Sequence, residues 1–400
     1  MSEDTRFETL AVHAGRRVDS HTGAVAPGIA LSSVYSPDAG SDYNYSRVDN
    51  PNRRRLEACL AQLEGGTACA CFASGVAAAS AVLHALAPGD RVLVTEDVYY
   101  GNRLLLTREL ARWGLEVVFV DTTDITAVKA ACTPRTRLIW AETPSNPMLR
   151  ISDIAALAQL AHSRDMRLAV DNTFATPVLQ RPLASDADLV VHSATKYFGG
   201  HSDVLGGAVI ARDDDKFFHR VRSHQITCGA VPSPFDCWLL HRSIATLPLR
   251  VRAQCANAHA VAEHLARHPA VAEVRYPGLP QHPQHALAMR QMRAGGAVVS
   301  FRPHGGRGAA EAAVAAARLF TRATSLGSVE SLIERRATAE GPDSATPPDL
   351  IRLSIGVEHA EDLIADLDYA LGEGTRFWRD SMSRPADPNA RPRMAGPGSE

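Results

Sequence analysis

Lys196 stands where a lysine suits covalent chemistry better than solubility. It follows Ser193, Ala194 and Thr195, directly after the apolar run DLVVH. An amine held near apolar walls loses its proton more easily and can form a Schiff base with a carbonyl. Because most lysines that follow a strand are solvated charges, this interpretation depends on what else the chain places beside it.

Two further features would complete a cofactor site. Asp171 follows the apolar run RLAV and could pair with a protonated pyridine nitrogen, the usual acidic partner in pyridoxal phosphate sites. Ser74, Gly75 and Val76 open a helical stretch, where backbone N–H groups and the helix dipole favour a phosphate. Singly, Asp171 could cap a turn and Ser74 a helix. Together with Lys196, they predict pyridoxal 5′-phosphate (PLP).

The elements around these residues predict an α/β domain over 54–245. Helical stretches separate short apolar runs that read as mostly parallel strands covered on both faces. These runs are RVLVTE, EVVFVD, RLIWAE, RLAVDN, DLVVHS and GGAVIA. Ligands of such sheets bind beyond the carboxyl ends of the strands, where Asp171 and Lys196 stand.

Three other segments flank this domain. A long helix, a strand at AVVSF and two further helices predict a smaller α+β domain over 246–376. Residues 1–53 lack a sustained period and are expected to form an extended arm. Residues 377–400 are proline-rich with little to bury, so we expect a disordered tail.

The amino-acid composition argues against some classes of binding partner. The 400 residues carry 42 Lys+Arg and 44 Asp+Glu, a net charge of −2, so no global field favours nucleic acid or an anionic membrane. No signal peptide and no apolar run of ~18 residues is visible. The odd count of 7 cysteines, without a C-x-x-C pair, is typical of reduced core residues in a cytoplasmic protein.

The run SATKYFGGHSDVLGG at 193–207 resembles the cofactor-lysine signature of the Cys/Met-metabolism family of PLP-dependent enzymes. The family includes cystathionine γ-synthase, cystathionine γ- and β-lyases, methionine γ-lyase and O-acyl-homoserine sulfhydrylases. Further ordered matches, from Glu8 to about Leu371, are YSR at 45–47, NP at 50–51, ETPSNP at 142–147, DNTF at 171–174, SLG at 325–327 and RLS at 352–354. The resemblance implies a fold-type I, PLP-dependent transferase-like enzyme.

The resemblance also implies residue roles. Lys196 would bind the cofactor and carry protons, and Asp171 would keep the pyridine nitrogen protonated. Arg352 would grip the α-carboxylate of the amino-acid substrate. The implied phosphate contacts are Ser74, Gly75, Val76, Ser193 and Thr195. The residues expected to orient or contact the substrate are Asn146, Ser325 and Glu330, with Glu330 on the distal side.

Tyr45 and Arg47 match arm residues that reach into the neighbouring subunit's site. A homo-oligomer, at least a dimer and commonly a dimer of dimers, is therefore expected. The family's tyrosine that stacks on the cofactor and takes part in catalysis comes from a D-x-Y-G-G segment, which here reads Asp97-Val98-Tyr99-Tyr100-Gly101. Counting from Asp97 favours Tyr99, while Tyr100 occupies a usual glycine position.

The sequence leaves open which activity within the family this chain has. The YSRxxNP form of the arm favours chemistry at Cγ, and Gly101 replaces the cysteine usual in methionine γ-lyases. We therefore expect C–S cleavage of the cystathionine γ-lyase type. γ-Replacement on an O-acyl-homoserine, or another γ-activated amino acid in a specialised pathway, are the alternatives. A PLP-binding regulator or scaffold is the non-enzyme alternative.

The chain departs from the family pattern near the expected distal substrate contacts. Asp49 replaces a common glycine, Ser328 replaces the second glycine of SLGG, and RRATAE at 335–340 replaces a stretch resembling HPAxMTH.

His264 and His268 are spaced i,i+4 on a predicted helix, a spacing that can bind metal. No third ligand is evident in the sequence, so a wet helix face is expected and no metal.

Overall fold

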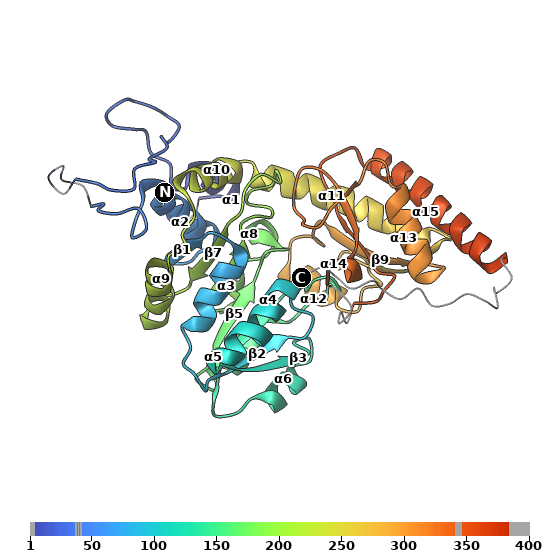
Figure 1. Cartoon of the computed structure of the whole chain (residues 1–400), viewed down its shortest axis with the longest axis horizontal. Helices are drawn as coiled ribbons and strands as arrows, with labels where there is room; N and C mark the ends of the chain where they lie inside the picture. The colour runs from blue at the N-terminus through green and yellow to red at the C-terminus, as the bar shows by residue number, and fades with distance from the viewer. Residues whose placement is uncertain (1–4, 37, 39, 41, 341–345, 384–400) are drawn as a thin grey trace, which may run out of the picture.

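The computed structural model describes residues 5–36, 38, 40, 42–340 and 346–383. A seven-stranded sheet forms the centre of the large domain (Figure 1). Its order is β1 (Ala68–Phe72), β7 (Gly207–Ala211), β6 (Leu189–Ser193), β5 (Arg167–Asp171), β4 (Thr136–Glu142), β2 (Arg91–Thr95) and β3 (Glu116–Val120). Within this sheet β7 alone runs antiparallel to its neighbours. The mostly parallel α/β sheet predicted from the sequence is confirmed.

Both faces of this sheet are buried. On β5, Leu168 and Val170 join a core cluster with α2 (Pro51–Glu64) and α7 (Ile154–His162). Ala169, between them, faces a second cluster with α3 (Gly75–His84) and α9 (Lys216–Cys228). Alternate side chains of one strand point to opposite faces, so burial on both sides requires the continuous apolar runs seen in the sequence.

The small domain contains a five-stranded sheet in the order β10 (Thr321–Arg322), β11 (Leu332–Arg335), β12 (Ile351–Ser354), β9 (Val298–Pro303) and β8 (Val271–Arg275). α11 (Leu247–Arg267) leads into it, and α13 (Gly306–Ala316) and α15 (Ala360–Ser383) lie beside it (Figure 1). Phe301 of β9 belongs to the same buried cluster as Leu168 of β5. The two domains therefore share a continuous core, which fixes the position of one domain against the other.

The remaining elements are α1 (Phe7–His13), α4 (Tyr100–Leu104), the π-helical turn η2 (Leu105–Leu110), α5 (Ala111–Trp113), α6 (Ile125–Ala131), α8 (Thr176–Leu179), the 3-10 turn η3 (Pro182–Ser185), α10 (Pro234–Ile244), α12 (His285–Gln291) and α14 (Arg336–Glu340). Among the described residues, no helix is both long and apolar enough to cross a membrane.

Several element boundaries differ from the sequence-based expectation. α2 begins at Pro51, because the Asn50 side chain accepts a hydrogen bond from Asn52 N and proline is favoured at the first helical position. α1 buries Phe7 in the core, so part of the expected arm packs on its own chain. α15 continues to Ser383, past the expected start of the tail at 377. The rest of that predicted tail, 384–400, lies outside the described residues.

Candidate active site

A cavity of about 220 Å³ lies between the carboxyl ends of β4, β5 and β6 and the small domain. The residues predicted from the sequence that line it are Ser74, Gly75, Val76, Tyr99, Asn146, Asp171, Ser193, Thr195, Lys196, Ser325 and Arg352. Residues not predicted as site residues also line it: Asn102, Glu142, Thr173, Phe174, Leu205, Thr324, Leu326 and Arg336. Long-range folding therefore gathers segments that span most of the chain around one small volume.

Lys196 projects into this cavity from the turn that follows β6. The turn is closed by hydrogen bonds from Lys196 N to Ser193 O and from Gly199 N to Ala194 O. Nζ of Lys196 donates to Oγ of Ser325, 2.8 Å away. Burial, followed by the positive charge of Arg352, lowers the pKa of Lys196 to about 8. The amine is therefore neutral far more often at pH 7 than a solvated lysine, as nucleophilic attack requires.

Asp171 ends β5, the strand next to β6, and also lines the cavity. Its Oδ1 accepts from the backbone N of Thr173 at 3.1 Å and from the Thr173 hydroxyl at 2.6 Å. Both bonds go to one oxygen, which leaves Oδ2 for a ligand. Burial raises the pKa of Asp171. An ionised carboxylate is costly to bury without a cationic partner, and a protonated pyridine nitrogen would provide one.

The start of α3 forms a cradle for an anion. The Ser74 hydroxyl accepts from Ala77 N, while helix geometry leaves the first N–H groups without intrahelical partners. Gly75 lies so near β6 that a Cβ there would be 2.8 Å from Cβ of Ser193. Glycine thus allows the backbone to approach the Ser193 and Thr195 hydroxyls that line the same cavity. The cradle, Lys196 and Asp171 together fit PLP.

Arg352 is held as a rigid fork on β12. Its Nη1 donates to Oδ1 of Asn146 and its Nη2 to the carbonyl oxygen of Ser325, each at 2.8 Å. Nη2 also pairs with Glu334, the cross-strand partner of Arg352 on β11. Burial lowers the pKa of Arg352 to about 10. A fixed, buried guanidinium suits a carboxylate ligand.

The structure separates the two adjacent tyrosines. Tyr99 lines the cavity, and its backbone N donates to Oε2 of the buried Glu142 at 2.9 Å. Tyr100 lines a neighbouring hollow that includes Arg103 and Arg150. A Cβ at position 101 would lie 2.5 Å from the Tyr99 ring, so Gly101 is the residue that permits this ring position.

Three predicted site residues are not among those that line the cavity. Tyr45 is 43% exposed, and Nη1 of Arg47 donates to the carbonyl oxygen of Ile226; both line a separate surface hollow. The Glu330 carboxylate accepts hydrogen bonds from the hydroxyls of Ser328 (2.7 Å) and Ser202. Ser328, a departure from the family pattern, thus fixes Glu330.

His264 and His268 do have a third polar neighbour, which the sequence analysis missed. Oδ1 of Asp368, on α15, lies 2.5 Å from Nε2 of His264 and 3.5 Å from Nε2 of His268. The backbone N of Ala270 donates to Nδ1 of His268, so the neutral ring carries its proton on Nε2. That nitrogen then faces Asp368 as a donor and offers no lone pair to a metal.

Residues 8–372 match the model of the family described as Cys/Met metabolism PLP-dependent enzyme. The chain is 48% identical over 374 residues to a cystathionine gamma-synthase of Mycobacterium bovis, covering 91% of this chain and 96% of the relative. It is 43% identical to a cystathionine gamma-lyase of Dictyostelium discoideum, covering 92% and 97%. The crystal structure of apo CalE6, a methionine gamma lyase from Micromonospora echinospora, superposes with a TM-score of 0.88 at 45% identity, covering 92% of this chain and 99% of that chain.

Proposed function

The chain belongs to the Cys/Met-metabolism family of PLP-dependent enzymes, and from that premise we propose that it breaks the bond between Cγ and its substituent in an L-amino acid. The observation that carries this proposal is the meeting of Lys196, Asp171 and Arg352 around one cavity. These residues supply an amine, a partner for the pyridine nitrogen and an anchor for the α-carboxylate.

Each group of residues has a separate task. The first turn of α3 with Ser193 and Thr195 would hold the cofactor phosphate, and Asp171 the pyridine nitrogen. When bound, PLP supplies an electron sink for the bonding pair released at the substrate Cα. Tyr99 would cover one face of the ring, a contact suited to an aromatic side chain.

Arg352 and Lys196 act on the substrate itself. The fork of Arg352, fixed by Asn146 and Ser325, would orient the α-carboxylate and so fix the direction of the Cα–H bond. The neutral amine of Lys196 would accept the Cα proton and later return a proton to the carbon chain. The Ser325 hydroxyl, 2.8 Å from Nζ, positions that amine.

The fate of Cγ distinguishes the two reactions. Without a thiol, loss of the substituent ends in 2-oxobutanoate and ammonia, the lyase outcome favoured by the sequence analysis. When a thiol replaces the substituent, the outcome is that of a synthase, the activity in the name of the 48%-identical relative. Both reactions need the bond between Cγ and its substituent to break, and the cavity residues support that step.

The test is a product analysis with purified holoenzyme. L-cystathionine should give L-cysteine and 2-oxobutanoate, or an O-acyl-L-homoserine with L-cysteine should give L-cystathionine, and a Lys196→Ala variant should do neither. Release of pyruvate and homocysteine from cystathionine, without any Cγ product, would assign cleavage at Cβ and refute the proposal.

We also propose a cytoplasmic homo-oligomer, most simply a dimer of dimers. Tyr45 and Arg47 lie outside their own chain's cavity, on an exposed arm that includes the exposed apolar residues Leu31 and Val34. A partner subunit would cover those apolar side chains and receive the arm. Sedimentation of wild type and of a chain lacking residues 1–49 tests this: loss of assembly on truncation is expected.

A further inference from the structure

Arg336 brings a second arginine into the cavity. It is 3% exposed and lines the same volume as Lys196 and Arg352. Arg336 belongs to the segment RRATAE at 335–340, where the family pattern resembles HPAxMTH. This chain therefore has an arginine where proline is usual. A buried charge is costly, and one placed beside a reaction centre suits recognition of an opposite charge.

Glu334 joins the two arginines. Its Oε1 contacts Nη2 of Arg352 and lies 3.3 Å from Nη1 of Arg336. Nε of Arg336 is 3.0 Å from Oε1 of Glu340. Two anions bound by these guanidinium groups would be only a few carbons apart, because both groups contact the same oxygen atom of Glu334.

Among the residues that line the cavity the cations outnumber the acids, and Glu334 and Glu340, which pair with the two arginines, are not part of this lining. Lys196, Arg336 and Arg352 are the cations, while the acids are Asp171 and Glu142. Burial and the nearby charge of Asp171 raise the pKa of Glu142 well above its usual range. The positive charges of Arg336 and Arg352 also help to lower the pKa of Lys196, which places their field at the reacting amine.

We propose that Arg336 determines substrate specificity by selecting amino acids whose γ-substituent carries a negative charge of its own. This inference rests on the proposed function, because it assigns Arg352 to the α-carboxylate and leaves Arg336 for the second anion. Carboxylate and phosphate both match the planar fork of a guanidinium. The γ-substituent would therefore be a half-ester of a short dicarboxylic acid or a phosphate.

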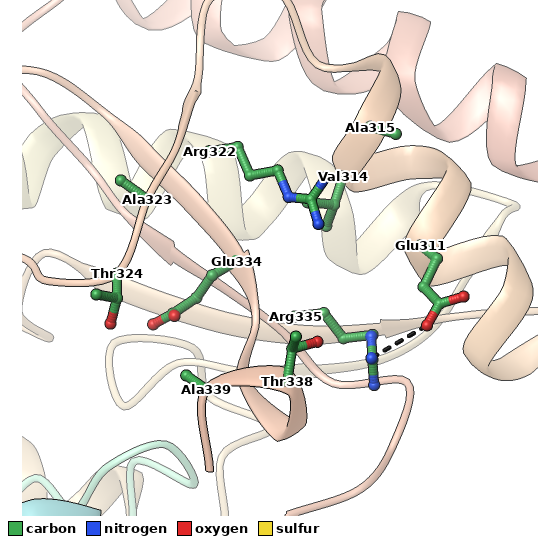
Figure 2. A pocket seen from close by; sticks show the side chains of 10 residues that line it. All are labelled: Glu311, Val314, Ala315, Arg322, Ala323, Thr324, Glu334, Arg335, Thr338 and Ala339. Carbon is green, nitrogen blue, oxygen red and sulfur yellow. Dashed lines mark ion pairs between the residues drawn. The ribbon is translucent and has the colours of Figure 1, made fainter. Parts of the chain in front are cut away.

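Arg335 provides a matched control. It precedes Arg336 in the chain, but its side chain points away from Glu334 and pairs with Glu311 of α13 at 3.0 Å (Figure 2). It lines a separate cavity of about 540 Å³ beside α13, and Glu334 points the other way, toward Thr324 (Figure 2). Arg335→Met thus removes the same charge from the adjacent position without changing the lining of the active-site cavity.

The first experiment measures binding without turnover. L-2-Aminoadipate and L-norleucine have the same carbon chain, but only the former ends in a carboxylate, and neither has a leaving group at Cγ. Dissociation constants come from the absorbance change of the holoenzyme. Wild type and Arg335→Met should bind aminoadipate at least about tenfold more tightly, the effect of one charge-assisted hydrogen bond. Arg336→Met should lose that preference.

The second experiment identifies the anion. Steady-state constants are measured for O-succinyl-, O-phospho- and O-acetyl-L-homoserine. Arg336→Met should raise KM at least about tenfold for a charged ester that the enzyme uses, and by less than about twofold for the acetyl ester. The larger effect among the charged esters shows whether the site takes carboxylate or phosphate.

Arg336→Lys covers the case in which Arg336→Met does not fold, because it keeps the charge and loses the bidentate fork. A ratio of the two dissociation constants reduced at least threefold in Arg336→Lys supports the inference. No preference in wild type, an unchanged ratio in the Arg336 variants, or an equal loss in Arg335→Met overturns it. If neither L-cystathionine nor any of the homoserine esters loses its γ-substituent, the proposed function is wrong, while the binding ratios still decide the role of Arg336.

Discussion

The shifted pKa of Lys196 gives a direct test of how the cavity activates its amine. Burial and the nearby arginines lower this pKa from 10.5 to about 8. At pH 7 about one-tenth of the amine would be neutral, against about one part in 3,000 for an amine of pKa 10.5, a gain of roughly 300-fold. Because only the neutral amine attacks a carbonyl, its reactivity should rise as pH passes through about 8.

The assay uses the small number of lysines in this chain. Only Lys129, Lys196 and Lys216 occur, and Lys129 and Lys216 are exposed, so they act as internal references. Apoprotein, prepared with hydroxylamine, is labelled with trace acetic anhydride from pH 6 to 11, and peptide mass spectrometry gives each labelling curve. The midpoint for Lys196 should lie near 8, well below the ordinary lysine value of 10.5.

Variants check the cause of the shift. Arg352→Met removes a nearby cation and should move the Lys196 midpoint upward, whereas Arg335→Met, outside the cavity, should leave it in place. A Lys196 midpoint near the ordinary lysine value of 10.5 would refute the argument that the cavity activates this amine. An equal shift in both arginine variants would show that the effect is not local.

Three other substitutions test the cofactor contacts. Asp171→Asn should slow Cγ cleavage about 100-fold and alter the visible spectrum of bound PLP, because the ring nitrogen loses its charged partner; an unchanged spectrum and rate would contradict this. Gly75→Ala should weaken PLP binding about tenfold in equilibrium dialysis, since the added Cβ would lie 2.8 Å from Ser193 Cβ, whereas Gly372→Ala, with open space, should not. Tyr99→Ala should lower kcat/KM at least tenfold and Tyr100→Ala by less than about twofold; the reverse order would assign the ring contact to Tyr100.

Local patterns in the sequence predicted the large sheet well, because its strands are buried on both faces. A strand such as β5 must then be apolar at every position up to its end, and the polar residue that follows, Asp171, marks the ligand edge. The helices α9 and α10 could not be predicted in this way. They bury only part of their surface, and charged residues interrupt their apolar stripes.

Two pairs of adjacent, identical residues show most clearly what the local sequence pattern cannot predict. Tyr99 and Tyr100 are the same residue type, yet the cap at the start of α4 turns one toward the cavity and the other away. Arg335 and Arg336 are likewise the same residue type, yet Arg335 lines the cavity beside α13 and Arg336 lines the active-site cavity. Motif counting favoured Tyr99 and treated Arg336 only as a departure from the family pattern.

The sequence by itself determined the covalent chemistry, because Lys196, Asp171 and Gly75 each stand at the end of a strand or the start of a helix. Those elements can be predicted from the periodicity of apolar residues in the chain. Only the tertiary structure decided which charges meet, because Arg352, Glu334 and Arg336 come together through the pairing of β11 with β12 and the packing of that sheet against the large domain. Contacts between distant segments depend on such pairing and shared burial, and no residue spacing encodes them directly.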